Sequence, residues 1–446
     1  MTIPADLREL QARAAAGRRS VMTIRIMVGH VLDKLRELPA ESVHCVVTSP
    51  PYYGLRSYGT EPQVWGGDPG CEHEWIDESR GWNNRHAIAV IRGEETKGEI
   101  SGDANHRDFR LKTNHCRHCN AWRGDLGLEP DLDLYLEHMV EIMREVRRVL
   151  RKDGTCWLNL GDAYANDAKW GGSTGGKHVS DLHGNTGIGR QKRNTGFKAK
   201  DLMLIPWRLA IRLQESGWWV RSAIVWAKKA PMPESCTDRP TSAWEPVFLL
   251  TRSAKYFYDQ EAVKEDGSEN SHGGTPIEGG AKQAALGQQI GGRMGIPSRR
   301  NLRNVWHLGP EPFPESHFAV FPTEIPRICI KAGTSERGVC PKCGVPWCRI
   351  LHRTTNLTLN AKGSYFDRGK TGARDRGDRT QSGDRFETQT IGWQPSCQCH
   401  AGSVPATVLD PFLGAGTTAL VANQLHLTQN LAYVLHPFCF FDDAHQ

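Results

Sequence analysis

The chain has 446 residues, of which 38% are hydrophobic and 24% charged, so it can bury one large core with insertions or several smaller domains. No run approaches the ~20 consecutive apolar residues of a membrane-spanning helix, and the amino-terminal residues lack the continuous apolar core of a secretory signal. The net charge of +6 permits a polyanionic partner without requiring one. We therefore expect an intracellular protein with no membrane segment.

The amino-terminal part predicts a strand, a short helix and a buried strand. Residues 23–28 alternate apolar and polar side chains, and residues 31–38 predict a short helix. Val43–Thr48 is an apolar, β-branched run typical of a buried parallel strand. It is expected to end at Ser49-Pro50-Pro51-Tyr52, because two consecutive prolines offer no N–H to a sheet. This tetrapeptide therefore lies at the carboxyl end of a strand, where open α/β sheets place their chemistry.

The middle of the chain continues the alternation of helix and strand. Residues 132–150 carry apolar side chains at helical spacing and predict a long amphipathic helix. Asp153-Gly154 is expected to turn that helix into a strand over residues 155–160, which Gly161-Asp162 follows. A helix over 201–215 and strands over 218–227 and 246–251 come next. Alternating elements of this kind predict an α/β fold with a mostly parallel sheet.

The pattern restarts near the carboxyl end, where a short strand at 407–409 precedes a glycine-rich segment and a helix over 419–425. Gly414 and Gly416 allow the backbone to approach a ligand closely, and two threonines, at 417 and 418, are suited to cap the helix. Such a loop suits a nucleoside cofactor lying over the strand end. It is not a phosphate-binding P-loop, because no lysine follows the second glycine. Taken alone, the segment is equally compatible with a plain turn.

The tetrapeptide suits methyl transfer to an exocyclic amine. Such an amine becomes nucleophilic when its nitrogen lone pair is released from conjugation, and acceptors that hold both amino hydrogens achieve this. The Ser49 side chain and the Pro50 carbonyl are suitable acceptors, and the prolines hold that carbonyl rigidly. Tyr52 offers a flat face on which a flipped base can stack. For the tetrapeptide alone, a rigid turn that closes a strand is an equal alternative.

Taken together and in this order, residues 48–52 and 410–418 resemble the amino-methylating DNA methyltransferases of the β class, in which the catalytic half precedes the cofactor half. Residues 154–164 continue the resemblance, residues 232–239 and 244–245 resemble stretches of phage and prophage members, and residues 317–322 resemble the segment that closes over the cofactor. The resemblance implies a Rossmann-like S-adenosylmethionine-dependent fold of circularly permuted order with zinc-binding insertions.

The same resemblance implies roles for individual residues. Ser49, Pro50, Pro51 and Tyr52 would form the catalytic segment that holds the base. S-adenosylmethionine would be surrounded by a larger set: Asp410, Pro411, Phe412, Gly414, Gly416, Thr417, His317, Phe318 and Pro322. The implied partner is double-stranded DNA, in the cytoplasm of a bacterium or phage-infected cell and within restriction-modification, and a homodimer is left open.

The implied division of the chain has three parts. Residues 22–260 would form the catalytic half, with an insertion over 66–125, and residues 311–446 the cofactor half, with an insertion over 338–402. Residues 261–310 form a variable segment between them. Stretches over 259–303 and 351–393 are candidates for target recognition. Basic residues gather in polar, glycine-rich stretches at 169–200, 293–303 and 362–385, which suit a DNA-facing surface.

Thirteen cysteines in an intracellular chain favour metal binding over disulfides. Cys340-x-x-Cys343 with Cys397-x-Cys399 offers four thiolates, and Cys71-x-His73 with Cys116-x-x-Cys119 offers three thiolates and an imidazole. Each set suits a structural zinc ion and leaves no open position for catalysis. The alternative is free cysteines in loops.

Two departures from the family affect the predicted activity. Ser49 stands where adenine-N6 enzymes more often carry aspartate, which favours cytosine N4 as the target and leaves adenine N6 as the alternative. Beyond residue 425 the resemblance ends, and Tyr433 or Val434 lies where a carboxylate is expected to bind the cofactor ribose. A catalytically impaired, methyltransferase-like DNA-binding protein is therefore a further alternative. An RNA or protein-glutamine methyltransferase is a third, since those enzymes carry a similar Asn-Pro-Pro-Tyr segment.

Overall fold

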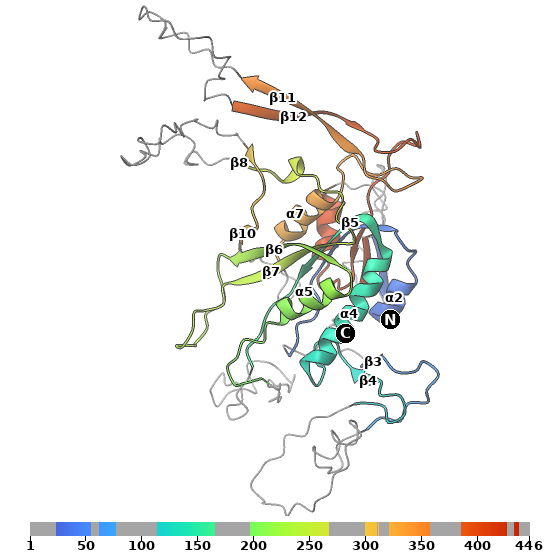
Figure 1. Ribbon diagram of the computed structural model, residues 1–446. Coiled ribbons are helices and arrows are strands. Elements are labelled where there is room, and N and C mark those ends of the chain that lie inside the picture. The colour runs from blue at the N-terminus through green and yellow to red at the C-terminus, as the bar shows by residue number, and fades with distance from the viewer. Residues whose placement is uncertain are drawn as a thin grey trace, which may run out of the picture.

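The computed structural model describes residues 24–54, 62–76, 114–165, 197–266, 299–309, 311, 321–356, 385–425 and 432–436. Its centre is an eight-stranded sheet of order β1-β14-β13-β2-β5-β7-β6-β10 (Figure 1). The strands of this sheet are β1 (Ile24–Val28), β2 (Val43–Thr48), β5 (Leu150–Asn159), β6 (Trp219–Lys228), β7 (Trp244–Thr251), β10 (Val305–Leu308), β13 (Val408–Asp410) and β14 (Ala432–His436). Within the described ranges no helix is long and apolar enough to cross a membrane.

Helices cover both faces of the sheet. The helices are α2 (Val31–Arg36), α4 (Leu132–Val149), α5 (Ile205–Glu215), α7 (Glu324–Gly333) and α8 (Thr417–Gln424), with a short 3-10 turn η1 (Glu261–Val263). Helices α2, α4 and α5 share one hydrophobic cluster with the sheet, and α7 and α8 share a second cluster on its other face. Three two-stranded ribbons complete the fold: β3 (Gln63–Trp65) with β4 (Trp122–Gly124), β8 (Glu265–Asp266) with β9 (Arg299–Arg300), and β11 (Cys348–Asn356) with β12 (Arg385–Gln394).

The strand order confirms the permuted arrangement. Strands β13 and β14, from the carboxyl-terminal part of the chain, lie between β1 and β2, and all of these neighbours pair in parallel. Strand β7 is antiparallel to both β5 and β6. The sheet is therefore mostly parallel, as predicted, with one reversed strand that the sequence pattern did not reveal.

Two predicted boundaries were wrong for identifiable reasons. Strand β5 begins at Leu150, not after Gly154, because Leu150 already pairs with Val43 and the Arg151–Asp153 ion pair accompanies an extended backbone. A side chain at Gly154 would meet the His44 carbonyl oxygen at 2.8 Å, so this glycine permits close strand contact. Helix α5 begins four residues later than predicted, because Leu204 adopts a left-handed backbone with φ of 55° just before the helix.

The carboxyl ends of β1, β2, β5, β6 and β13 meet at one edge of the sheet, which we call the carboxyl edge; the antiparallel β7 begins there. Segments far apart in the sequence are brought together at this edge: Ser49 follows β2, Lys228 ends β6, Glu245 lies near the start of β7, and Asp410 ends β13. The opposite edge, where β2 and β5 begin, we call the amino edge.

Helix α7 packs so closely on the sheet that its last residue has to be glycine. A β-carbon at Gly333 would overlap the Thr155 hydroxyl and lie 2.9 Å from the Cys45 sulfur. We predict that Gly333→Ala lowers the free energy of unfolding by ~1–3 kcal/mol through overpacking. Lys331→Ala, at an exposed position of the same helix, is the control and should change it by less than about 0.5 kcal/mol. Chemical denaturation measures both, and equal stability of the two variants would contradict this packing.

Candidate active site and metal-binding clusters

The segment that follows β2 is fixed by contacts with α4 and with the residues that precede α4. The Tyr135 hydroxyl on α4 donates to the Pro51 carbonyl oxygen at 2.9 Å, and the Gly54 N–H donates to the Gly127 carbonyl oxygen at 2.8 Å. A β-carbon at Gly127, whose φ is +91°, would lie 2.9 Å from the Tyr52 carbonyl oxygen. The backbone from Pro51 to Gly54 is therefore fixed in position by neighbours that allow little displacement.

The Tyr52 ring packs closely against the turn that follows β5. A β-carbon at Gly161 would overlap the Tyr52 ring atoms, so only glycine leaves room for the ring there. The neighbouring Asp162 fixes the turn, since its Oδ1 accepts from the Ala163 and Ile205 N–H groups at 2.9 and 3.0 Å. Gly161 and Asp162 thus help to position Tyr52, a role that was not predicted from the sequence.

A hydrogen-bonded polar network extends from the tetrapeptide across three strands. The Tyr52 hydroxyl donates to Glu245 Oε2 at 2.8 Å and lies 3.1 Å from Asn159 Oδ1. Ser49 Oγ lies 3.3 Å from the same Asn159 oxygen, and Lys228 Nζ donates to Glu245 Oε1 at 2.5 Å. Sequence reasoning missed Lys228 and noted Asn159 and Glu245 only as parts of similar stretches, because their proximity depends on the strand order.

Asp410 joins the two halves of the chain at the carboxyl edge. Its Oδ1 accepts from Thr48 Oγ1 at 2.8 Å and from the Phe412 N–H at 3.0 Å, and its side chain is buried. Burial raises the pKa of Asp410 to about 7, although the hydrogen bonds from Thr48, Phe412 and Thr418 oppose that rise. Thr48 and Asp410, which are far apart in the sequence, are thereby fixed to each other within one site.

The glycine loop after β13 fits a polar ligand. Gly414 and Gly416 have positive φ of 52° and 81°, and nothing lies within 4 Å of a β-carbon placed at Gly414. The predicted threonine cap was wrong: Gly416 is the N-cap of α8 without a side-chain hydrogen bond, and Thr418 Oγ1 donates to the Val47 carbonyl at 3.4 Å. Thr417 Oγ1 is buried and has no partner among the described residues. An uncapped helix start and a buried hydroxyl suit the polar groups of a nucleoside cofactor.

The other predicted cofactor residues have different placements. Phe412 and Pro411 are buried beside the loop, and Pro322 is buried just before α7. His317 and Phe318 lie outside the described residues, as do most of the three basic stretches. Strand β14 pairs Val434 with Asp410 and continues to His436, so the strand end lies two residues beyond the position expected for the ribose carboxylate.

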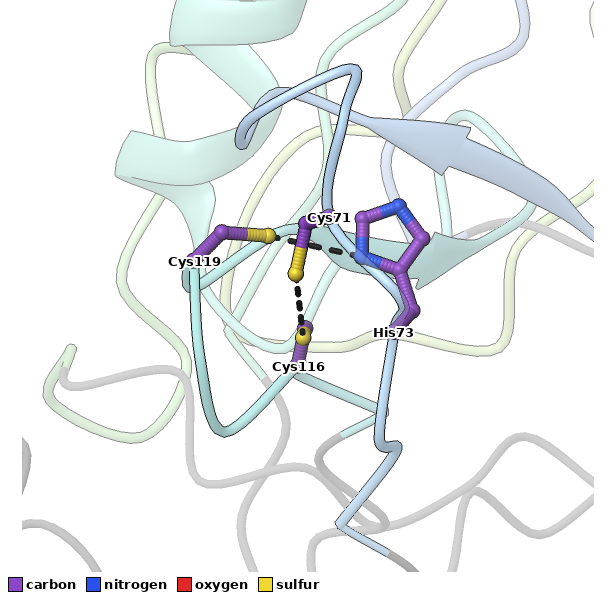
Figure 2. A group of neighbouring side chains, drawn as sticks. All are labelled: Cys71, His73, Cys116 and Cys119. Atoms are coloured by element: carbon purple, nitrogen blue, oxygen red, sulfur yellow. Dashed lines mark hydrogen bonds between the residues drawn. The ribbon is translucent and has the colours of Figure 1, made fainter.

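Cys71, His73, Cys116 and Cys119 form one compact group, the cysteine–histidine cluster (Figure 2). The four ligand atoms lie within 4.8 Å of one another, with 3.9 Å between the sulfurs of Cys71 and Cys116 and 3.4 Å from the Cys119 sulfur to His73 Nδ1. A tetrahedral zinc ion would place two sulfurs about 3.8 Å apart, and sulfur and nitrogen about 3.5 Å apart. The predicted residues are thus brought together in a geometry that fits zinc.

Cys340, Cys343, Cys397 and Cys399 form the second group, the four-cysteine cluster, again with all ligand atoms within 4.8 Å. It is attached at the amino edge of the sheet: His44 Nε2 lies 3.0 Å from the Gly344 carbonyl oxygen, and Arg151 Nη1 donates to the Cys343 carbonyl at 3.0 Å. Burial lowers the pKa of His44 to about 4, so its imidazole is neutral at neutral pH.

The two clusters lie at opposite ends of the molecule. The β11–β12 ribbon extends from the four-cysteine cluster away from the sheet (Figure 1). The β3–β4 ribbon, beside the cysteine–histidine cluster, lies at the other end of the molecule. The ribbon, which includes part of the predicted target-recognition stretch 351–393, therefore begins at the edge opposite Ser49.

A buried chain of contacts connects the β3–β4 ribbon to the Ser-Pro-Pro-Tyr segment. The Trp65 and Trp122 rings stack on the His138 ring of α4, at centroid distances of 4.8 and 5.6 Å. His138 Nδ1 lies 3.0 Å from Glu129 Oε1, and the other Glu129 oxygen accepts from the Gly127 N–H at 2.8 Å. Since Gly127 packs against Tyr52, the β3–β4 ribbon beside the cysteine–histidine cluster supports the Ser-Pro-Pro-Tyr segment through this chain of contacts.

The chain is therefore an α/β protein in which a rigid Ser-Pro-Pro-Tyr segment and a glycine loop lie side by side at the carboxyl edge of the sheet. The sequence profile of the DNA methylase family matches residues 43–340. Type II methyltransferase M.Cfr9I of Citrobacter freundii is 35% identical over 308 residues, covering 69% of this chain and 71% of the relative. M.SmaI of Serratia marcescens is 31% identical over 319 residues, covering 72% and 78%.

Among solved structures, the PvuII DNA methyltransferase (cytosine-N4-specific) is similar at 13% identity and a TM-score of 0.41, covering 96% of this chain and 92% of that one. The family match and the relatives place the chain plainly: it belongs to the N6/N4 DNA methylase family. It is a site-specific DNA methyltransferase that acts on an exocyclic amino group.

The buried carboxyl of Asp410 predicts a specific pH dependence of stability. Its pKa is raised to about 7 in the folded chain, from an ordinary value of about 3.9, so the folded state binds this proton more tightly. The contribution of Asp410 to stability is thus greatest below about pH 4 and is lost as pH rises through about 7. Asp410→Asn keeps an acceptor oxygen for Thr48 and cannot titrate.

We therefore expect the stability of Asp410→Asn, relative to the native chain, to rise by a few kcal/mol between pH 4 and pH 7, at about 1.4 kcal/mol per unit of pKa shift. Urea denaturation at intervals across that range measures the difference. A constant difference would contradict the raised pKa.

Proposed function

We propose that the chain transfers a methyl group from S-adenosylmethionine to the N4 amino group of a cytosine flipped out of double-stranded DNA. The observation that carries this proposal is the rigid Ser49–Tyr52 segment beside the glycine loop, joined to it by the Thr48–Asp410 hydrogen bond. Serine at the first position of the segment favours cytosine, and adenine N6 is the second candidate.

Each residue of the segment has a role in activating the amine. The Ser49 hydroxyl and the Pro50 carbonyl accept the two amino hydrogens and so release the nitrogen lone pair from the ring. The Tyr52 ring, held against Gly161, stacks on the flipped base and fixes its plane. Because the backbone around Pro51 is anchored by Tyr135, these acceptors keep their positions as the carbon–nitrogen bond forms, the methyl–sulfonium bond breaks and one amino hydrogen leaves the nitrogen as a proton to water.

Residues of the cofactor half hold S-adenosylmethionine. When bound, the cofactor supplies an electrophilic methyl group attached to sulfonium. The loop of Gly414 and Gly416 admits its nucleoside part, with the Thr417 hydroxyl available as a hydrogen-bond partner. Asp410, Pro411 and Phe412 shape the loop, and His317, Phe318 and Pro322 are assigned to the methionine end by resemblance. With Val434 or Tyr433 in place of the ribose carboxylate, we expect weak cofactor binding.

The division of the chain follows the same proposal. Residues 22–260 supply the base-holding half and residues 311–446 the cofactor half, with insertions over 66–125 and 338–402 that carry the two clusters. Both clusters hold structural zinc, in support of which all four ligand atoms of each lie within 4.8 Å of one another. Neither zinc ion takes part in methyl transfer, since four protein ligands leave no open position.

The first test is incubation of the purified protein with labelled S-adenosylmethionine and mixed-sequence duplex DNA, followed by nucleoside analysis. We expect label in N4-methylcytosine. Ser49→Ala and Tyr52→Ala should each reduce the rate by roughly a hundredfold, as is typical when one preorganised polar contact is lost. Ser42→Ala, at the opposite end of the same strand, is the matched control and should retain the native rate.

The outcomes separate the alternatives. Label in N6-methyladenine would replace cytosine by the second candidate, and no label in any base would reject the activity. Native rates for both Ser49→Ala and Tyr52→Ala would remove the segment from the mechanism.

The metal proposal is tested by elemental analysis of protein purified without chelators. We expect about two zinc ions per chain, one per four-ligand set. Cys340→Ser should lower this to about one and expose residues 338–402 to proteolysis before the central sheet, because metal binding there is local folding energy. Cys236→Ser, outside both clusters, should leave the zinc content unchanged. Zinc-free native protein would contradict the proposal.

A further inference from the structure

The role proposed for Ser49 imposes a direction on its hydrogen bonds. A serine hydroxyl has one hydrogen to donate and two lone pairs. To accept a hydrogen from the base amine, Ser49 must give its own hydrogen to another group. Among the described residues, two acceptors lie within reach of Ser49 Oγ: Asn159 Oδ1 at 3.3 Å and the Tyr52 hydroxyl oxygen at 3.4 Å. Whether they accept depends on the direction in which their own hydrogens point.

Tyr52 is directed by Glu245. The Tyr52 hydroxyl has one hydrogen, and the Glu245 carboxylate at 2.8 Å is a closer and more strongly accepting partner than the Asn159 amide oxygen at 3.1 Å. Because the Tyr52 hydroxyl donates its hydrogen to Glu245, its oxygen can only accept a hydrogen bond from Ser49. A carboxylate is suited to this because, when ionised, it accepts and never donates.

Asn159 is directed by the same strand, β7. Its Nδ2 lies 3.1 Å from the Pro246 carbonyl oxygen and 3.4 Å from Glu245 Oε2, both acceptors, so the amide nitrogen faces β7. The amide oxygen is consequently turned to Ser49 and Tyr52. Asn159 is buried, at 3% exposure, and has little room to rotate.

Lys228 holds Glu245 in place. Its ammonium group donates to Glu245 Oε1 at 2.5 Å, and both side chains are mostly shielded, at 29% and 16% exposure. Lys228 also lies over the Trp226 ring at 5.0 Å, which limits its movement. The two oxygens of Glu245 are thus divided between a cation on one side and the tyrosine hydroxyl on the other.

We infer that Glu245, held by Lys228, is a positioning residue that sets the direction of the network so that Ser49 offers a lone pair to the base. Glu245 acts through Tyr52 and Asn159 and need not touch the base. The arrangement selects for a group that donates hydrogens, an amine, over a carbonyl at the same place on a pyrimidine ring. This inference rests on the proposed methyl transfer.

The test compares Glu245→Gln with the native chain in steady-state methylation of duplex DNA. Glutamine keeps the shape and removes the charge, and its NH2 group can donate towards Tyr52 and reverse the network. We expect kcat to fall roughly ten- to hundredfold, the loss of one hydrogen bond to a charged group, while KM for DNA and for S-adenosylmethionine changes little. Glu145→Gln, which breaks the Glu145–Arg148 pair of similar exposure on α4, is the matched control and should keep the native kcat.

A double variant separates positioning from general damage. Tyr52→Phe removes only the hydroxyl that donates to Glu245, so Tyr52→Phe with Glu245→Gln should lose far less than the product of the two single losses. Should Glu245→Gln fail to fold, Tyr52→Phe alone has the same expectation of reduced kcat at unchanged KM, and native kcat there would overturn the inference.

The result distinguishes the inference from the function on which it rests. If the native chain methylates DNA and Glu245→Gln does so at a native rate, the inference is wrong and the activity is retained. If Glu245→Gln instead raises KM with unchanged kcat, Glu245 contributes to binding and the inference is again wrong. A native chain that does not methylate DNA contradicts the proposed function itself.

Discussion

The hydrogen bond from Thr48 to Asp410 is the constraint on which the site depends. It joins β2 to β13 across 362 residues of sequence, and both partners are buried. Breaking it would remove a donor from a buried carboxyl group, which is costly away from water. Because β2 leads directly into the Ser-Pro-Pro-Tyr segment and β13 into the glycine loop, this contact and the parallel pairing of the two strands together set the distance between the two segments.

The sequence predicted those parts of the site that local pattern determines. The buried strand Val43–Thr48 was predicted residue for residue, since an apolar run ended by two prolines leaves little freedom. Both metal-ligand sets assembled as predicted, because close pairs of ligands on short loops need only one further contact to meet. The permuted strand order followed from the resemblance, not from periodicity.

The contacts that could not be predicted from the sequence depend on the order and direction of the strands. Asn159, Lys228 and Glu245 lie on three strands and meet only because β7 runs antiparallel between β5 and β6. No spacing in the chain indicates that reversal. The threonine cap failed for a different reason: Thr418 bonds to the backbone of β2, so tertiary contact outweighed the local preference for capping.

The two insertions each bring together four side chains that could hold a metal ion, one group at either end of the sheet. The cysteine–histidine cluster lies beside the β3–β4 ribbon, whose two tryptophans stack on His138. His138 contacts Glu129, and Glu129 accepts a hydrogen bond from Gly127, which packs against Tyr52. The four-cysteine cluster is fixed to His44 and Arg151 at the amino edge, where the β11–β12 ribbon begins. Few of the described residues of either insertion belong to the central hydrophobic clusters, and the proposed zinc ions would supply further order.

We propose that two segments far apart in sequence form a single site for cofactor and base. Ultraviolet cross-linking of labelled S-adenosylmethionine to the native chain, followed by peptide mapping, tests this arrangement. We expect label in the peptides that contain Tyr52 and the glycine loop after Asp410, reduced by excess unlabelled cofactor. Label confined to peptides of the amino edge, such as the β11–β12 ribbon, would contradict it.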